Sequence, residues 1–422
     1  MASLADPTFI DRSDADVLSI GHFCLPGDTD RQAARERLAR LQDTMRDHDL
    51  GAAIFFDAIN IRYACGVRNM QINTTRNPGR YVFVSVEGPV TLFEYRGCSH
   101  LVDGYDTVGE IRPGRGVHPF YGGVSHYRDQ IVAFVDEIGE LMHASGVAGA
   151  RLGIERSPIE VVPALIDAGF EIVDASIAVD RAKSIKTPTE LELIRASVAG
   201  TEAAVAHMER ALVPGRTENE VWAELHRALV AGGGEYVETR LFNSGARTNP
   251  WFQESSDKVI TAGELVCLDT DAVGCHGYYT DVSRTFLAGD VSATARQREL
   301  YGLADEQLQH NIGLLEVGLG FREFAERTWK IPDEFFDHRY LGPIHGNGMV
   351  AEYPIVPYPD LFDEIGDDGV FEANMTICVE SYIGSVLGGE GVKLEEQVLI
   401  TDAGVEVLTT YPFEPRLLPQ HS

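Results

Sequence analysis

The spacing of apolar residues predicts an alternation of helices and strands over the first half of the chain. Between residues 31 and 50 apolar side chains recur at steps of four, three and four, which predicts an amphipathic helix that ends at Gly51. The other elements expected here are a polar arm up to about Asp30, a buried strand at 52–57, a turn-rich loop and a β-hairpin within 60–95, a helix from about Tyr127 to 149 and a strand at 150–155. This alternation is typical of a small α/β domain.

The pattern changes near Lys183, where two strongly capped helices follow each other. Thr187, Pro188 and Glu190 form a capping box with proline at the first helical position, and an apolar face continues to Leu212. A second capping box, Thr217 to Glu220, begins another helix that runs through Val230. We therefore expect two domains, with residues 1–182 in the first and 183–422 in the second.

The second domain combines strands and helices in an α+β order. Leu265–Phe286 reads as a β-hairpin, followed by helices from about Ala293 to Leu315 and from Phe321. Two further β-rich runs, at 374–384 and 391–401, lie on either side of a glycine-rich connection.

Composition and charge exclude several classes of function. The chain has 422 residues, 44% hydrophobic and 24% charged, with a formal net charge of −30. That charge repels nucleic acids and anionic membranes and favours small cationic or zwitterionic molecules. The N-terminal residues lack the features of an export signal, and no stretch is long and apolar enough for a membrane span. The six cysteines contain no C-x-x-C pair, so we expect reduced thiols in a cytoplasmic protein.

Three aspartates in the Leu265–Phe286 hairpin indicate a metal site. Asp269 and Asp271 are two residues apart, so on a strand they share a face, and the return of the hairpin brings Asp281 opposite them. Carboxylates so close repel one another unless a cation lies between them. The alternative is an acidic hairpin with solvated side chains, since aspartate is common in turns.

Two glutamates and a histidine complete this candidate site. Glu380 and Glu395 each interrupt an otherwise apolar or β-branched run, which aims them at a buried face, unless the two strands form an edge hairpin whose glutamates face water. His345 lies among small residues in Gly-Pro-Ile-His-Gly-x-Gly, although a lone histidine is more often structural. Five carboxylates and one imidazole suit two divalent ions with bridging carboxylates.

The order of these residues resembles the "pita-bread" metalloenzymes: methionine aminopeptidase, aminopeptidase P, prolidase and the metal-free creatinase. The matching pattern is Asp…Asp-x-x-x-Arg-Thr-Phe…His-Gly-x-Gly…Glu…Glu, and it follows two capped helices. The resemblance implies a curved antiparallel sheet backed by helices, a smaller creatinase-like α/β N-terminal domain and a homodimer. It also implies Asp269, Asp271, Asp281, His345, Glu380 and Glu395 as metal ligands.

Three departures from the peptidases make peptide hydrolysis improbable. Asp269 and Asp271 flank Thr270, where the peptidases have one aspartate. Trp251 and Phe252 lie where the peptidases carry a substrate-facing histidine, and Ala351 replaces a second histidine that precedes Glu352. Both histidines thought to handle the scissile amide are therefore missing.

The same departures are similar to the DddP-type dimethylsulfoniopropionate (DMSP) lyases. The matching segments are Asn60–Ala64, Asn69–Gln71, Thr239–Glu254 and Lys393–Thr401. This resemblance implies cleavage of the C–S bond of DMSP, a small zwitterion with a carboxylate and a sulfonium, to dimethyl sulfide and acrylate. It implies two divalent metal ions, with iron favoured by the resemblance and manganese or zinc as alternatives. Trp251, Phe252 and Tyr340 are expected to bind the sulfonium, either in this role or as plain core aromatics.

The proton-accepting group is left open by Ala351, because these lyases carry an aspartate at that position. We expect Asp271, Glu352 and Tyr340 to be the catalytic residues, with a metal-bound hydroxide as a further alternative. Arg62 and Arg240 are either carboxylate clamps or salt-bridge partners. Two other functions stay open: a metallohydrolase of a small C–N substrate, like creatinase, prolidase or aminopeptidase P, and a non-catalytic binding protein.

Overall fold

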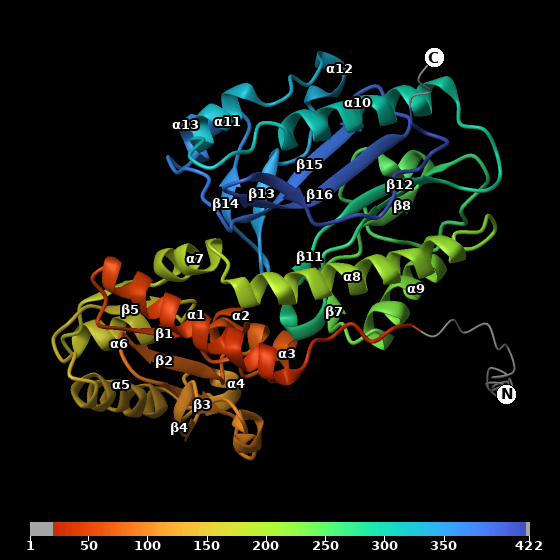
Figure 1. Ribbon diagram of the computed structural model, residues 1–422. Coiled ribbons are helices and arrows are strands. Elements are labelled where there is room, and N and C mark those ends of the chain that lie inside the picture. Colours follow the sequence, from red (N-terminus) through yellow and green to blue (C-terminus); the bar gives the residue numbers. More distant parts are fainter. Residues whose placement is uncertain (1–19, 419–422) are drawn as a thin grey trace, which may run out of the picture.

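The computed structural model describes residues 20–418, which form an N-terminal and a C-terminal domain (Figure 1). The N-terminal domain contains α1 Gly27–Asp47, β1 Ala52–Phe55, α2 Ala58–Cys65, α3 Gln71–Arg76, β2 Tyr81–Ser85, β3 Val90–Glu94, a 3-10 turn Ser99–Val102, β4 Val108–Pro113, α4 Pro119–Gly122, α5 Tyr127–Ala144, β5 Leu152–Glu155, α6 Val161–Asp167, β6 Ile172–Asp174 and α7 Ser176–Ser184. Its six strands form one mixed sheet in the order β4-β3-β2-β1-β5-β6. The predicted α/β character of this domain is confirmed.

Two hydrophobic clusters cover the two faces of this sheet. One cluster includes Leu41 of α1 and Val179 of α7, and it continues into α8 through Leu193. The other includes Phe134 of α5 and Leu165 of α6. Because the first cluster joins α1, α7 and α8, the N-terminal domain and the start of the C-terminal domain share one core.

The C-terminal domain begins with the two helices whose caps the sequence predicts. Thr187 accepts the backbone N–H of Glu190 while the Glu190 side chain accepts that of Thr187, and Thr217 and Glu220 repeat this arrangement. The helices are α8 Pro188–Ala211 and α9 Glu218–Ala231. Both capping boxes are confirmed, whereas the exact boundary at 182/183 stays a prediction.

The remaining elements build curved antiparallel sheets covered by helices. They are β7 Tyr236–Val237, β8 Phe242–Ser244, a 3-10 turn Gly245–Thr248, β9 Leu265–Asp269, β10 Ala272–Val273, a 3-10 turn Cys275–Gly277, β11 Tyr279–Thr280, β12 Ser283–Leu287, α10 Ala295–Ile312, α11 Phe321–Arg327, α12 Asp333–Phe336, β13 Ile344–Asn347, β14 Ala351–Val356, α13 Phe362–Ile365, β15 Thr376–Gly384, β16 Gly391–Thr401 and β17 Gly404–Val407. The sheets have the orders β14-β13-β15-β16-β17, β12-β9-β8 and β11-β10-β7.

Helices lie on both sides of this strand layer. Figure 1 shows α10 along one side of β15 and β16, while α8 lies toward the N-terminal domain. The side of the sheet that carries α10 is filled by an apolar cluster that includes Leu308, Val379 and Leu394. The opposite side of β15 and β16 is therefore left for polar side chains, and the α+β fold class is confirmed.

Two local predictions in the N-terminal part need comment. The expected loop within 60–80 contains two helices, because the Asp57 side chain accepts the backbone N–H groups of Ile59 and Asn60 and so caps α2, which ends at Gly66 in the left-handed region. The expected polar arm falls partly on residues 1–19, outside the described residues. Its described end lies against the C-terminal domain, where Phe23 donates its backbone N–H to Gly232.

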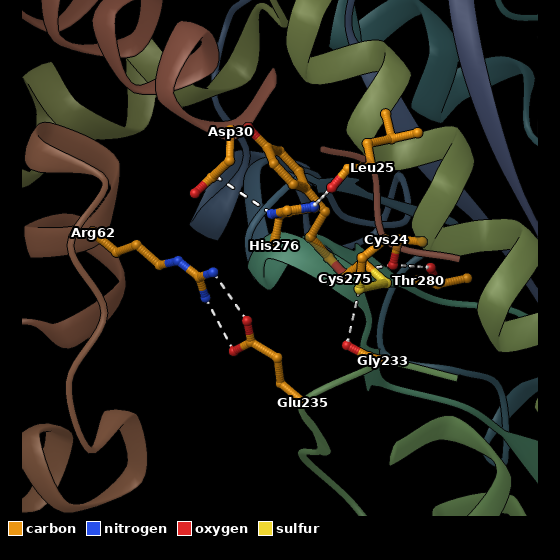
Figure 2. Close-up of a disulfide and its surroundings, with 11 residues drawn as sticks. Cys24, Leu25, Asp30, Arg62, Gly233, Glu235, Cys275, His276 and Thr280 are labelled. Carbon is orange, nitrogen blue, oxygen red and sulfur yellow. Dashed lines mark hydrogen bonds and ion pairs between the residues drawn. A yellow bond between two sulfur atoms is a disulfide. The ribbon is translucent and has the colours of Figure 1, made fainter. Parts of the chain in front are cut away.

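A disulfide joins this arm to the hairpin that carries the aspartates (Figure 2). Cys24 and Cys275 are bonded across a sequence separation of 251 residues, so the prediction that all thiols are reduced is wrong for these two. Cys65, Cys98, Cys267 and Cys378 are free, and Cys98 is half-buried while the other three are buried. Sequence spacing gives no signal for a pairing that depends on how the arm packs.

An ion pair next to the disulfide ties the two domains together. Arg62 of α2 places its two terminal nitrogens 2.9 and 3.0 Å from the carboxylate of Glu235, and both side chains are buried (Figure 2). Of the two roles expected for Arg62, the salt bridge is therefore the observed one. Within residues 20–418, no helix is long and apolar enough to cross a membrane.

Candidate metal centre

Glu380 and Glu395 form a directly facing pair on the buried side of the sheet. They are register partners in the antiparallel strands β15 and β16, so their side chains project from the same face. Both are 0% exposed. The alternative of an edge hairpin with glutamates in water is therefore wrong: β15 is flanked by β13 and β16, and β16 by β15 and β17.

The three aspartates converge, although by a different local geometry from the one expected. Asp269 ends β9, but Asp271 lies beyond the end of the strand with φ +40°, and Asp281 lies between β11 and β12. One carboxylate oxygen from each comes within 4.8 Å of the other two. A turn in the left-handed region at Asp271, rather than simple strand alternation, gives the convergence.

His345 faces this cluster with one ring nitrogen. Its Nδ1 lies 2.9 Å from the carbonyl oxygen of Gly346, and since a carbonyl only accepts, Nδ1 carries the hydrogen. That leaves Nε2 directed to the carboxylates, 3.2 Å from Glu380 Oε1 and 3.7 Å from Asp281 Oδ2. A histidine held in this tautomer by a backbone carbonyl presents Nε2 as a metal ligand.

Lys393 also belongs to the cluster, although it is not among the residues predicted to be functional. Its Nζ lies 2.5 Å from Glu380 Oε2, 3.2 Å from Glu395 Oε2 and 3.6 Å from Asp269 Oδ2, and the side chain is fully buried. It also donates to Ser283 Oγ, while that hydroxyl hydrogen-bonds to both Asp269 and Glu395. Lys393 precedes Glu395 by two residues and so shares its face of β16, which was the available sequence signal.

Burial and mutual repulsion raise the pKa values of three of the acidic groups, Asp271, Asp281 and Glu395. Burial, followed by Glu395 and Asp271, holds the pKa of Asp281 well above its usual range. Burial and then Glu380 raise the pKa of Glu395, and burial and then Asp269 raise the pKa of Asp271 to about 6. For Asp269, burial alone would raise the pKa, but Lys393 and hydrogen bonds bring it below its ordinary value. The cluster therefore holds more negative charge than its cationic neighbours balance.

The donor set fits divalent cations. Glu380 Oε1 and Glu395 Oε1 are buried and have no hydrogen-bond partner among the described residues. Five carboxylates with one free imidazole nitrogen offer hard oxygen donors and one borderline donor. A bound cation would supply the partner that these oxygens lack, so the six residues predicted as ligands are brought together as one candidate metal centre.

Protein freed of metal by a chelator is expected to lose stability as the pH rises from about 6.5 to about 9. Burial lowers the pKa of His345, but Glu380, whose Oε1 lies 3.2 Å from Nε2, and the other nearby carboxylates outweigh burial and raise that pKa to about 9. The unfolded value is about 6.5, so this stabilisation is complete below pH 6.5 and is lost as the pH passes through 9. Melting temperatures at pH 6.5, 7.5 and 9 test this. A flat profile would contradict it, and saturating metal should reduce the slope.

The predicted aromatic residues differ in exposure. Trp251 is 6% exposed in an apolar cluster with Leu241, Cys267 and Tyr382, so it belongs to the core. Phe252 is 47% exposed, and its ring centroid lies 5.3 Å from that of Tyr340. The Tyr340 ring lies 4.6 Å from Lys393 Nζ, which places this aromatic pair beside the carboxylate cluster.

The residues expected to move the proton lie in two places. Asp271 is in the cluster, where its two oxygens accept hydrogen bonds from Tyr279 and Thr239. Glu352 ion-pairs instead with buried Lys186. Ala351 is exposed, and Ala351 and Glu352 line a cavity of about 630 Å³ between the two domains, together with residues such as Lys183 and Glu238.

Arg284 and Arg240 have structural roles. Arg284 donates to Glu396 and to the carbonyl oxygens of Glu395 and Tyr411. Arg240 donates to Asn219 and to Ser255. These contacts fit Arg284 as a support for the strand that carries Glu395, and Arg240 as part of a polar network.

Comparison with protein families gives matches over both domains. Residues 192–402 match "Metallopeptidase family M24", and residues 37–185 match "Creatinase/Prolidase N-terminal domain". Among curated proteins, the chain is 36% identical to the dimethylsulfoniopropionate lyase DddP of Roseovarius nubinhibens, with 99% of this chain and 96% of that protein covered. It is also 36% identical to the DddP of Roseobacter denitrificans, over 91% of this chain and 87% of that protein.

Solved structures show the same fold at lower sequence identity. An Xaa-Pro dipeptidase from Bacillus anthracis superimposes with a TM-score of 0.71 and 22% identity, covering 90% of this chain and 99% of that one. The prolidase from Pyrococcus horikoshii gives a TM-score of 0.70 and 21% identity, covering 90% and 99%. At these identities the likeness concerns the fold alone.

Proposed function

The chain belongs to metallopeptidase family M24, and from its near full-length likeness to the DddP lyases we propose that it is a metal-dependent lyase that cleaves dimethylsulfoniopropionate to dimethyl sulfide and acrylate. The likeness of 36% identity over 99% of the chain is the observation that carries this conclusion. The cluster of carboxylates beside an aromatic pair is consistent with a zwitterionic substrate. Metal ions held by the cluster would bind the substrate carboxylate, and the aromatic faces would contact its sulfonium.

Six residues would hold the metal: Asp269, Asp271, Asp281, His345, Glu380 and Glu395. We propose a dinuclear centre, with iron the expected metal and manganese or zinc as alternatives. When bound, such ions act as Lewis acids that polarise a substrate carboxylate and so make the neighbouring C–H more acidic. Five of the six side chains belong to two groups of converging ligand atoms that share Asp281, and Glu380 Oε1 lies 3.2 Å from His345 Nε2, which supports this proposal.

The protein residues would orient the substrate and accept its proton. Phe252 and Tyr340 are proposed to face the sulfonium, while Trp251 packs behind them. A carboxylate removes the proton from the carbon next to the substrate carboxylate, a C=C bond forms, and the C–S bonding pair leaves with dimethyl sulfide. Of the carboxylates expected in this role, we favour Asp271, because Glu352 is engaged by Lys186. The pKa of the Tyr340 hydroxyl is raised by burial and then by Glu380, which keeps it a donor at neutral pH.

Headspace detection of dimethyl sulfide tests the proposed reaction. Purified protein given DMSP should release dimethyl sulfide and equimolar acrylate, and a chelator should stop the release until metal is returned. The match to family M24 keeps hydrolysis of a small C–N substrate as the second candidate, so Xaa-Pro dipeptides and cyclic amidines belong in the same assay. Hydrolysis of these without dimethyl sulfide would replace the lyase by a hydrolase, and inactivity with every substrate would favour a binding protein.

Replacing Phe252 by alanine is expected to raise KM for DMSP by about 3- to 10-fold with little change in kcat. A cation–π contact at a partly exposed ring is worth about 0.5–2 kcal/mol, and it acts on binding rather than on proton transfer. Steady-state kinetics measures this, with Phe120→Ala as a control because Phe120 is exposed on α4 of the other domain. An unchanged KM would remove Phe252 from the substrate site.

Replacing Ala351 by aspartate is expected to raise kcat of the lyase by about tenfold or more. The resemblance places an aspartate base at this position, and a positioned general base contributes about 10²–10⁴-fold. Ala351 is exposed at the start of β14, so the larger side chain has room. Ala351→Asn is the matched control without a base. Equal rates for the two variants and the natural chain would contradict this expectation and would leave Asp271 as the base.

Assembly and compartment are proposed on the resemblance and the composition. We propose a homodimer, which size-exclusion chromatography with light scattering tests. The proposed cytoplasmic location and the Cys24–Cys275 disulfide point in opposite directions, because disulfides are rare in reducing cytosol. Alkylation of the thiols under denaturing conditions, at the moment the cells are lysed, separates these possibilities: four labelled cysteines indicate the disulfide, and six indicate reduced thiols.

A further inference from the structure

A free cysteine lies among the predicted metal ligands. The Sγ atom of Cys378 and one ligand atom from each of Asp281, His345 and Glu395 lie within 4.8 Å of one another. Cys378 is fully buried and is not part of a disulfide. The sequence predicts Cys378 only as a buried thiol, although its place two residues before Glu380 puts both side chains on one face of the strand.

The strand register fixes why this sulfur is there. Cys378 is the direct partner of His345 in β13 and of Gln397 in β16, so the three side chains form a row across three neighbouring strands. Cys378 precedes Glu380 by two residues and therefore shares its face of β15. This row lies two residues along β15 and β16 from the facing pair of Glu380 and Glu395, on the side of the cluster where His345 lies.

The polar groups around the sulfur lack partners. Both amide atoms of Gln397 and the Oδ1 atom of Asn347 are buried without a hydrogen bond among the described residues, as is Glu395 Oε1. Asn347 Nδ2 donates to Cys378 Sγ at 3.1 Å, which is a bond that a negatively charged sulfur accepts more strongly than a thiol. Buried polar atoms are rarely left unpaired, so these atoms indicate that a further partner is missing at this end of the site.

We propose that Cys378 is a seventh ligand of the metal centre, bound to the ion on the His345 side. That ion would have one sulfur, one nitrogen and carboxylate oxygens, whereas the ion on the Asp271 side would have oxygens alone. A soft thiolate favours zinc, iron, cobalt and cadmium over manganese and magnesium. On binding, the S–H bond breaks, an S–metal bond forms and the proton leaves to solvent, so no oxidant or reductant is needed.

This inference rests on the metal centre of the proposed function but not on its substrate. Its measurements contain no DMSP and read the metal environment directly. If metal binds without sulfur, this inference fails and the metal centre stands. If no metal binds at the site, the metal centre itself fails and the inference with it.

X-ray absorption of the zinc-loaded natural protein is the first test, because it needs no variant. A sulfur ligand gives a shell at about 2.3 Å, separate from the nitrogen and oxygen shell at about 2.0–2.2 Å. A spectrum fitted by nitrogen and oxygen alone overturns the proposal. A sulfur shell in the natural protein that is absent from Cys378→Ser supports it.

Metal preference is the second test, with matched variants. Cys378→Ser is expected to weaken cadmium and zinc binding by about 10- to 100-fold, the range for loss of a group that supports a metal site, and to change manganese binding by less than about threefold. Cys65→Ser is the control, since Cys65 is also buried and free but lies in α2 of the N-terminal domain. Equal losses for cadmium and manganese, or no loss for either, would overturn the proposal. If Cys378→Ser does not fold, the absorption spectrum of the natural protein decides.

Discussion

Replacing Asp281 by asparagine is expected to reduce the release of dimethyl sulfide by about a thousandfold or more and to lower the metal content of the protein. Asp281 belongs to both groups of converging ligand atoms: one with Asp269 and Asp271, the other with His345, Cys378 and Glu395. Asp281 would therefore be a ligand shared by the two proposed ions, and an asparagine amide would hold them less well because it carries no charge. Lewis-acid stabilisation is worth several kcal/mol, and each 1.4 kcal/mol is about a factor of ten in rate.

The same substitution is expected to stabilise the metal-free protein. Burial and its carboxylate neighbours hold the pKa of Asp281 well above the usual range, which means that its charge is unfavourable without a cation. Metal analysis, together with melting curves recorded after chelation, separates a specific loss of metal binding from a general loss of folding. Asp290→Asn is the control, because Asp290 is exposed just beyond β12. Normal activity with normal metal content in Asp281→Asn would contradict the proposed centre.

Replacing Lys393 by methionine is expected to destabilise the chelated protein by about 3–5 kcal/mol, the usual cost of removing one partner from a buried ion pair. The ammonium lies within 4 Å of Glu380, Glu395 and Asp269, all of which are buried. Two divalent ions together with this ammonium would balance the five carboxylates, so saturating metal should recover much of the lost stability.

Denaturant unfolding with and without metal measures this effect. Lys393→Arg should lose less than Lys393→Met because it keeps the charge, and Lys330→Met is the surface control. If Lys393→Met unfolds at the same denaturant concentration as the natural chain in chelator, the ammonium does not hold the carboxylates together.

Much of the site could be predicted because its charged residues interrupt apolar runs within single strands. Glu380 and Glu395 stand out as charges in apolar runs, and the same criterion applied to Lys393 identifies the third charged residue of that layer. The caps at Thr187 and Thr217 are equally local, since each depends on residues three positions apart. Local patterns of this kind fix the elements and the faces on which their charges lie.

Features that depend on packing between distant segments could not be predicted. The left-handed turn at Asp271 and the pairing of Glu352 with Lys186 depend on contacts between segments that are distant in the sequence. Lys186 lies between α7 and α8, whereas Glu352 lies in β14. Cys378 becomes a neighbour of His345 through the register of β13 and β15, and this register cannot be predicted from the sequence of either strand alone. The interplay of segments, and not residue type, decides which carboxylates reach the metal centre and which do not.

The bond between Cys24 and Cys275 closes most of the first 275 residues into a covalent ring. The N-terminal domain, α8 and α9 all lie within that ring in the sequence. The ring closes at Cys275, in the turn between Asp271 and Asp281 (Figure 2). A protease that cuts one peptide bond anywhere in this stretch therefore leaves the two fragments joined. The N-terminal domain is accordingly a loop tethered at both ends to the ligand hairpin, and a thiol reductant, rather than a single cut, is what releases one end.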